Sequence, residues 1–258
     1  MKLAISGKGG VGKTTLAALL CHLYAREGRR VLAVDADPDA NLGSALGVAP
    51  QELQRVAPIA GLSDLVRERT GAEPGRPGQF FLLNPRVDDI PERFWLERGG
   101  IRLLVMGGVK GGGGGCACPE NALVQALLRH LLLERSDTVI VDLEAGLEHL
   151  GRGTARGVDA LLVVVEPGRR SFQTAASVFR LASDLGVPRV MAVGNKARPG
   201  EEEAIRKGVG DIPLLGVLPF DPEAARADLE GLPPHQACPA LLRAAAEVKS
   251  RLDQSCPG

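Results

Sequence analysis

The chain of 258 residues has few aromatic side chains and no excess of charge of either sign. Aromatic residues make up 3% of the sequence, whereas hydrophobic residues as a whole reach 45%. The core must therefore be built from Leu, Val, Ile and Ala, which is the composition of buried parallel strands. Lys and Arg together number 31, as do Asp and Glu. Because the net charge is zero, we expect no nucleic-acid partner and no attraction to an anionic membrane, although a local basic patch is compatible with this balance.

The sequence also lacks any apolar run that approaches the length of a membrane span. Met1-Lys2-Leu3 lead directly into a glycine-rich loop. We therefore expect neither a transmembrane helix nor a signal peptide, and a cytoplasmic protein. Five cysteines form an odd set in a reducing compartment, which favours metal or thiol chemistry over a disulfide framework.

Apolar runs recur along the chain, with helical patterns between most of them. They lie at 3–6, 31–35, 80–83, 101–106, 138–142, 160–165, 190–193 and 214–218. This alternation predicts an α/β fold, with a doubly wound, mainly parallel sheet of about eight strands flanked by helices. A sheet of this size is usually one unit, so we expect a single domain over residues 1–258. Residues 51–100 are the least readable part of the chain.

Two stripes of apolar residues describe the first and last helices. The stripe from Leu16 to Leu23 has helical spacing and contains Cys21 and His22, which we interpret as structural. The stripe from Leu241 to Leu252 predicts a helix that packs on the sheet rather than one that lies on a membrane surface.

A phosphate-binding loop follows the first expected strand. The residues from Gly7 to Thr15 read G-K-G-G-V-G-K-T-T and match the template G-x-x-x-x-G-K-[ST] between a strand and a helix. Glycines let backbone N–H groups converge on a phosphate, and the helix N-terminus adds its dipole. The nucleotide contacts are expected from Gly9, Gly10, Val11, Gly12, Lys13, Thr14 and Thr15. Lys13 should reach the β- and γ-phosphates of ATP, and the Thr14 hydroxyl should ligate Mg²⁺.

A cluster of acidic residues ends the second expected strand. Because ligands bind at the carboxyl ends of parallel strands, the segment from Asp35 to Asn41 should open at the same edge as the phosphate loop. Pro38 forces an extended or turn geometry that lifts Asp37 off the strand end. We choose Asp37 as the residue that orients the attacking water, with Asp39 and Asn41 as second choices. The alternative is an acidic turn that caps a helix.

Further candidate residues follow three later strands. Asp142 ends an apolar run and is expected to hold Mg²⁺ through water, and Gly146 offers its backbone to the γ-phosphate. Asn195, followed by Lys196, offers both a donor and an acceptor to an adenine edge. Pro219-Phe220 would pack on the other side of that base.

These motifs together resemble the deviant phosphate-loop ATPases of the SIMIBI class, the group that holds nitrogenase iron protein, MinD and the CooC-type nickel-insertion proteins. The resemblance implies that Lys8, the extra lysine of the loop, crosses a dimer interface to the partner's nucleotide. It also implies that ATP clamps two subunits face to face and that hydrolysis releases them. The catalytic set expected on this basis is Lys8, Lys13 and Asp37.

A pair of cysteines follows a run of five glycines. Cys116 and Cys118 are one residue apart, so they can chelate one metal but leave a four-coordinate ion two ligands short. A two-fold partner would supply the missing pair. Pro119 suits the first turn of a helix, so Cys118 should lie at a helix N-terminus, which favours the thiolate. The alternative is a pair of small residues that caps a helix after a loose loop.

Within the deviant group, the Cys pair and the Glu148-His149 segment resemble the CooC-type ATPases, which mature carbon monoxide dehydrogenase, and their counterparts that serve acetyl-CoA synthase. The resemblance implies an ATP-promoted homodimeric metallochaperone that binds Ni²⁺ through Cys116 and Cys118 of both subunits. The same thiolates also suit Zn²⁺. His149 is either a spare metal ligand or a structural histidine.

Two other functional classes use the same loop. The first is a MinD/ParA-like positioning or partitioning ATPase, whose basic surface or cationic last helix does not stand out here. The second is an ATP-dependent electron donor, which would need a cluster-binding cysteine shortly after Asp142. The sequence has none between Asp142 and Thr154.

Overall fold

The structure of the chain is a computed structural model that describes residues 1–76, 78–107, 118–147, 150 and 152–256. In this part of the chain, one sheet of eight strands has the order β3-β4-β2-β5-β1-β6-β7-β8. The strands are β1 (Lys2–Gly7), β2 (Val31–Ala36), β3 (Leu96–Arg98), β4 (Ile101–Val105), β5 (Thr138–Leu143), β6 (Ala160–Val165), β7 (Val190–Ala197) and β8 (Leu214–Pro219). All neighbours pair in parallel except β3 and β4, which confirms the predicted mainly parallel, doubly wound sheet.

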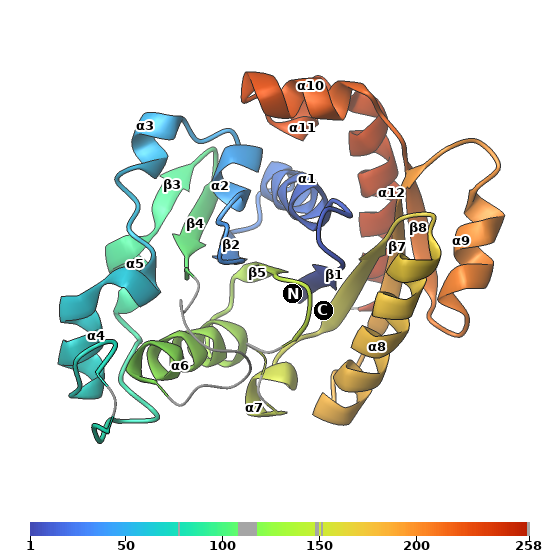
Figure 1. The fold of residues 1–258 in the computed structure, drawn as a ribbon. Coiled ribbons are helices and arrows are strands. Elements are labelled where there is room, and N and C mark those ends of the chain that lie inside the picture. Colours follow the sequence, from blue (N-terminus) through green and yellow to red (C-terminus); the bar gives the residue numbers. More distant parts are fainter. Residues whose placement is uncertain (77, 108–117, 148–149, 151, 257–258) are drawn as a thin grey trace.

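Helices cover both faces of this sheet (Figure 1). The longer ones are α1 (Lys13–Arg26), α4 (Ser63–Thr70), α6 (Pro119–Leu133), α8 (Arg169–Leu185), α9 (Glu202–Val209), α10 (Glu223–Glu230) and α12 (Pro239–Ser255). The shorter ones are α2 (Leu42–Ala45), α3 (Pro50–Leu53), the 3₁₀ turn η1 (Ile59–Gly61), α5 (Ile90–Phe94), α7 (Arg152–Ala155) and α11 (Pro234–Ala237).

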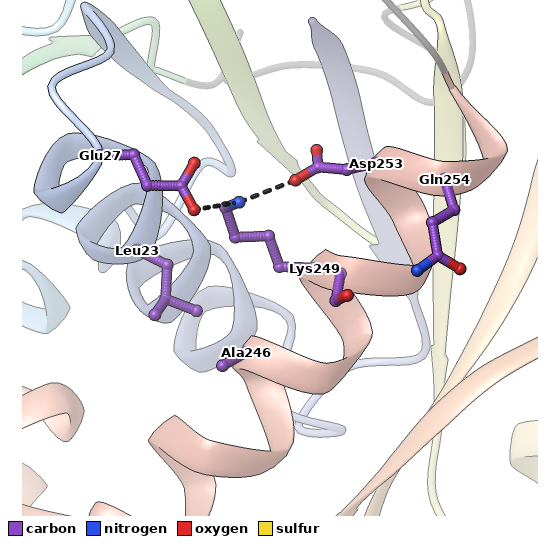
Figure 2. Close-up of a pocket in the computed structure, with 7 residues that line it drawn as sticks. Leu23, Glu27, Ala246, Lys249, Asp253 and Gln254 are labelled. Carbon is purple, nitrogen blue, oxygen red and sulfur yellow. Dashed lines mark hydrogen bonds and ion pairs between the residues drawn. The ribbon is translucent and has the colours of Figure 1, made fainter.

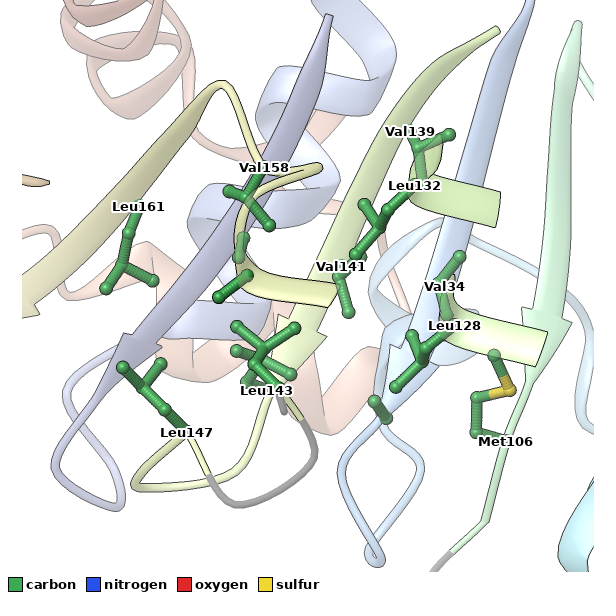
Figure 3. Close-up of a cluster of buried hydrophobic side chains, with 14 of the residues drawn as sticks. Val34, Met106, Leu128, Leu132, Val139, Val141, Leu143, Leu147, Val158 and Leu161 are labelled. Carbon is green, nitrogen blue, oxygen red and sulfur yellow. The ribbon is translucent and has the colours of Figure 1, made fainter. Parts of the chain in front are cut away.

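The core divides into two layers because alternate strand residues face opposite sides of the sheet. On β5, Val139 and Val141 pack into one apolar cluster and Ile140 into the other. The first cluster contains the buried side of α6, and Figure 3 shows Leu128 and Leu132 directed at the strands. The second contains the buried sides of α1 and α12. Both faces of β1, β2, β5 and β6 are buried, which explains their uninterrupted apolar sequences.

The predicted helical stripes at the two ends of the chain are confirmed. Leu241, Ala245, Val248 and Leu252 of α12 are all buried, and α12 packs on β8. A hollow between α1 and α12 contains Lys249, whose ammonium lies 2.6 Å from Glu27 and 2.7 Å from Asp253 (Figure 2). Lys249 is 5% exposed, so these ion pairs are part of the seam between the two helices rather than a ligand site.

One predicted strand is wrong. Residues 80–83 form a loop in which Phe80 is 100% exposed, and the Leu82 N–H donates to the Thr70 carbonyl instead of to a strand. The free edge of β4 is taken by β3, a short antiparallel strand that the sequence analysis missed. Gly99 and Gly100 join β3 to β4 with φ of 56° and 77°, as a tight two-residue hairpin turn requires.

Strand order places the nucleotide motifs together. The chain leaves β1 for β2 and β4 on one side, and later for β6, β7 and β8 on the other. The carboxyl end of β1 is therefore a topological switch point, where open α/β sheets bind their ligands.

Candidate nucleotide site

The phosphate-binding loop connects β1 directly to α1. Gly12, the residue before α1, has φ of 95°, which only glycine adopts without strain. A Cβ at Gly12 would collide with the side-chain amide of Asn195, and a Cβ at Gly7 would collide with the Val164 carbonyl oxygen. The loop is therefore packed tightly against β6 and β7, and Gly7 and Gly12 are required by space as well as by conformation.

Two consecutive residues of β7 hold two consecutive carbonyl groups of this loop. The Asn195 side-chain amide donates to the Val11 carbonyl at 2.8 Å, and the Lys196 ammonium donates to the Gly10 carbonyl at 2.6 Å. Asn195 is 6% exposed. These bonds hold the Gly10 and Val11 carbonyl groups in place, which is a positioning role that the local sequence does not predict. The contact of Asn195 with adenine stays a prediction.

The predicted magnesium ligands face each other. The Thr14 hydroxyl donates to Asp142 Oδ2 at 2.6 Å, while Asp142 Oδ1 is buried and has no hydrogen-bond partner among the described residues. Burial raises the pKa of Asp142 to about 6, against the opposing effects of the Thr14 hydroxyl and the charge of Lys13. A hydroxyl beside an uncompensated buried carboxylate oxygen fits a hard, oxygen-binding cation such as Mg²⁺.

A second buried carboxylate lies beside Asp142. Asp35 pairs with Asp142 in the β2–β5 register and is completely buried. Its oxygens accept the N–H groups of Leu42 at 2.8 Å and Asp37 at 3.2 Å, so it braces the loop that carries Asp37. Burial raises the pKa of Asp35 to about 7, and the nearby Asp142 adds to the shift. No local sequence pattern predicts this role, because it depends on the register of two strands that are far apart in the chain.

Asp37 is better placed for chemistry than its alternatives. It is half-buried, its Oδ1 accepts the Asp39 N–H at 3.0 Å, and its charge contributes to the raised pKa of Asp142. Asp39 and Asn41 are exposed. Asp37 thus lies at the rim of the buried carboxylates, and its role in positioning water stays a prediction.

The remaining predicted contacts surround the same strand ends. Gly146 follows β5, and its N–H lies 3.4 Å from the Ser6 hydroxyl of β1. Phe220 follows β8, and its N–H donates to the Ala197 carbonyl at the end of β7. Phe220 is 49% exposed, and the Arg198 guanidinium lies 5.4 Å from the centre of its ring. An exposed ring beside Pro219 and a cation is suited to stacking on a base.

The predicted thiol site is only partly within the described residues. Cys118 is the N-cap of α6 and Pro119 begins the helix, as predicted, whereas Cys116 and His149 lie outside the described residues. Among the described residues, no group of three or more His, Cys, Asp or Glu side chains could hold a metal ion. The Met106 N–H at the end of β4 donates to the Asp35 carbonyl at 2.8 Å, so the segment that leads toward the cysteines starts beside the nucleotide site.

Comparison with known proteins identifies the family. Residues 2–234 match the CobQ/CobB/MinD/ParA nucleotide binding domain. The chain belongs to this family. It is an ATPase that resembles the CooC type: it is 50% identical to the carbon monoxide dehydrogenase accessory protein CooC of Rhodospirillum rubrum over 93% of this chain and 91% of that protein. It is also 42% identical to an uncharacterized ATP-binding protein of Methanocaldococcus jannaschii, over 90% of each chain.

Solved structures agree on the fold. MinD in the MinC:MinD complex of Aquifex aeolicus superposes with a TM-score of 0.69 at 19% identity, covering 98% of this chain and 95% of that one. At that identity the likeness concerns the architecture alone. Within the described residues, no helix combines the length and apolar character needed to cross a bilayer.

Proposed function

We propose that this protein is a cytoplasmic, ATP-hydrolysing homodimer that carries nickel and assists its insertion into carbon monoxide dehydrogenase or the related acetyl-CoA synthase. The observation that carries the proposal is the 50% identity, over nearly the whole chain, to a carbon monoxide dehydrogenase accessory protein. The balanced charge agrees with a protein rather than a nucleic acid or a membrane as its partner.

The ATPase step follows from the groups around the loop. Backbone N–H groups from Gly9 to Thr15 receive the phosphates, and Lys13, 6% exposed, brings a positive charge to them. Mg²⁺, when bound, neutralises charge on the transferred phosphoryl group, and Thr14 and Asp142 would hold it. Asp37 orients the attacking water, and Lys8 reaches the nucleotide of the partner protomer.

Nickel is the cargo of the reaction. Cys116 and Cys118 from two protomers would complete one four-thiolate site across the two-fold axis, where Zn²⁺ competes for the same ligands. Two local features support a link between this site and ATP. Cys118 is the N-cap of α6, where the helix dipole favours thiolate, and the Met106–Asp35 hydrogen bond joins the strand before the cysteines to the strand before Asp37.

Reconstitution tests this proposal. Nickel-deficient carbon monoxide dehydrogenase is incubated with Ni²⁺, MgATP and this protein, and the recovered activity is measured. We expect activation that depends on ATP and that is lost in the Cys116→Ala/Cys118→Ala variant. Cys256→Ala removes a buried thiol elsewhere and serves as the matched control. Equal activation by the double variant would exclude delivery through these thiols, and ATP-dependent binding to vesicles or DNA without activation would favour the positioning class.

A further inference from the structure

Glu166, which no motif singled out, faces the extra lysine of the phosphate loop. Its Oε1 lies 3.5 Å from the ammonium nitrogen of Lys8, in the same protomer. We propose that Glu166 holds Lys8 within its own protomer before ATP-driven pairing and releases it when a second copy docks. This inference rests on the proposed function, in which Lys8 acts on the partner's nucleotide, and it assigns Glu166 as a positioning residue.

Strand register brings the two residues together. Gly7 at the end of β1 pairs with Val164 near the end of β6, so Lys8 and Glu166 both emerge from the same edge of adjacent strands. The backbone N–H of Glu166 donates to the hydroxyl of Ser171, which is 2% exposed and lies in the first turn of α8. The carboxylate of Glu166 therefore extends from a backbone held by this hydrogen bond toward a lysine side chain that is 40% exposed.

The same carboxylate also faces Lys196. Its Oε2 lies 3.9 Å from the Lys196 ammonium, which donates to the Gly10 carbonyl at 2.6 Å. When Lys8 leaves, Glu166 keeps Lys196 as a partner, and Lys196 keeps its bond to the loop. The Glu166 carboxylate therefore keeps a cation nearby after Lys8 moves away, and Lys8 can move without disturbing the phosphate-binding loop.

The Lys8–Glu166 ion pair is weak enough to break when a second protomer docks. At 3.5 Å and with both side chains partly exposed, the pair is an ordinary surface ion pair rather than a tight hydrogen bond. Pairs of this kind change an equilibrium by roughly 1.5- to 5-fold. Because a symmetric dimer breaks two of them, the effect on its dissociation constant should be about 2- to 25-fold.

The first measurement tests the contact in the nucleotide-free protein. Glu166→Gln keeps the size of the side chain and removes its charge. Glu203→Gln is the matched control, because Glu203 pairs with Lys207 at 3.6 Å on α9, away from the loop. Each protein is labelled with limiting acetic anhydride, and labelled lysines are quantified by peptide mass spectrometry. We expect Lys8 to react about 1.5- to 5-fold faster in Glu166→Gln and at the wild-type rate in the control. Equal Lys8 reactivity in all three proteins would overturn the proposal.

The second measurement tests the consequence for pairing. The dimer dissociation constant is measured by sedimentation with a non-hydrolysable ATP analogue and Mg²⁺. We expect Glu166→Gln to dimerise about 2- to 25-fold more tightly than wild type, with no change in the control. An unchanged or larger dimer dissociation constant for Glu166→Gln would refute the proposal that Glu166 restrains Lys8. If wild type does not dimerise at all, the proposed trans role of Lys8 fails, and the labelling result still reports on the Lys8–Glu166 contact by itself.

Discussion

Replacing Gly12 by alanine should damage the phosphate-binding loop by two separable effects. Gly12 has φ of 95°, and a Cβ there would collide with the Asn195 side-chain amide. Gly9 lies in the same loop, has no positive φ, and has no atom within 4 Å of an added Cβ. Gly12→Ala and Gly9→Ala are therefore a matched pair that differ in backbone conformation and space.

The magnitude follows from these two effects. A left-handed conformation costs a residue with a Cβ about 1–2 kcal/mol. Displacing Asn195 also removes its 2.8 Å hydrogen bond to the Val11 carbonyl, which adds about 1–2 kcal/mol. We expect Gly12→Ala to lower the free energy of unfolding by about 2–4 kcal/mol in total. Gly9→Ala should leave it unchanged or raise it by up to about 1 kcal/mol.

Urea unfolding of the nucleotide-free protein measures this difference, with Asn195→Ala and the double variant completing a cycle. If Gly12→Ala already expels Asn195, adding Asn195→Ala should cost little more, and the interaction free energy should be about 1–2 kcal/mol. Strict additivity of the two single variants would show that the amide and the Cβ do not meet. Equal destabilisation by Gly9→Ala would show that the loop does not have this backbone conformation.

Three further predictions concern the charged groups. Asp142→Asn should stabilise the nucleotide-free protein by on the order of 1–3 kcal/mol at pH 8 and by little at pH 4. The reason is that the pKa of Asp142 in the folded state, about 6, lies above its ordinary value of 3.8. The folded state therefore binds the proton more tightly than the unfolded state does, and the protein loses stability as the pH rises from about 4 to 6. Urea unfolding at the two pH values measures this difference. Lys8→Ala should keep nucleotide affinity within a few-fold of wild type but lose turnover, and a phosphate-release assay that shows full activity would contradict the cross-subunit role. Asp37→Asn should lower turnover by about 100-fold or more, whereas Asp39→Asn should stay within a few-fold of wild type, as measured by the same assay.

Local patterns in the sequence predicted much of the fold and the site. The loop from Gly7 to Thr15, the start of α6 at Pro119 and the apolar stripe of α12 each depend on residues close together in the chain, and all three are found where expected. The strand ends that carry Asp37 and Asp142 followed from the rule that parallel strands present their carboxyl ends at one edge.

Features that depend on pairing between distant segments were missed. The Asn195–Val11 hydrogen bond joins residues 184 positions apart, and the Asp35–Asp142 pairing depends on strand register. Residues 80–83 are as apolar as a strand, but the edge of β4 is already paired with β3, so residues 80–83 have no neighbouring strand to pair with. The Gly99-Gly100 pair was the one local sign of a hairpin here. The strand before it, β3, has three residues, which is too few to show the alternation of polar and apolar residues that predicts a strand.

In the proposed function, ATP brings the cysteines of two protomers into one metal site. Native mass spectrometry with Ni²⁺, with and without a non-hydrolysable ATP analogue, measures dimer mass and bound metal together. We expect one nickel ion per dimer when the analogue is present, and no bound nickel in the Cys116→Ala/Cys118→Ala variant. Unchanged nickel stoichiometry in that variant, or nickel bound equally to monomers, would contradict it.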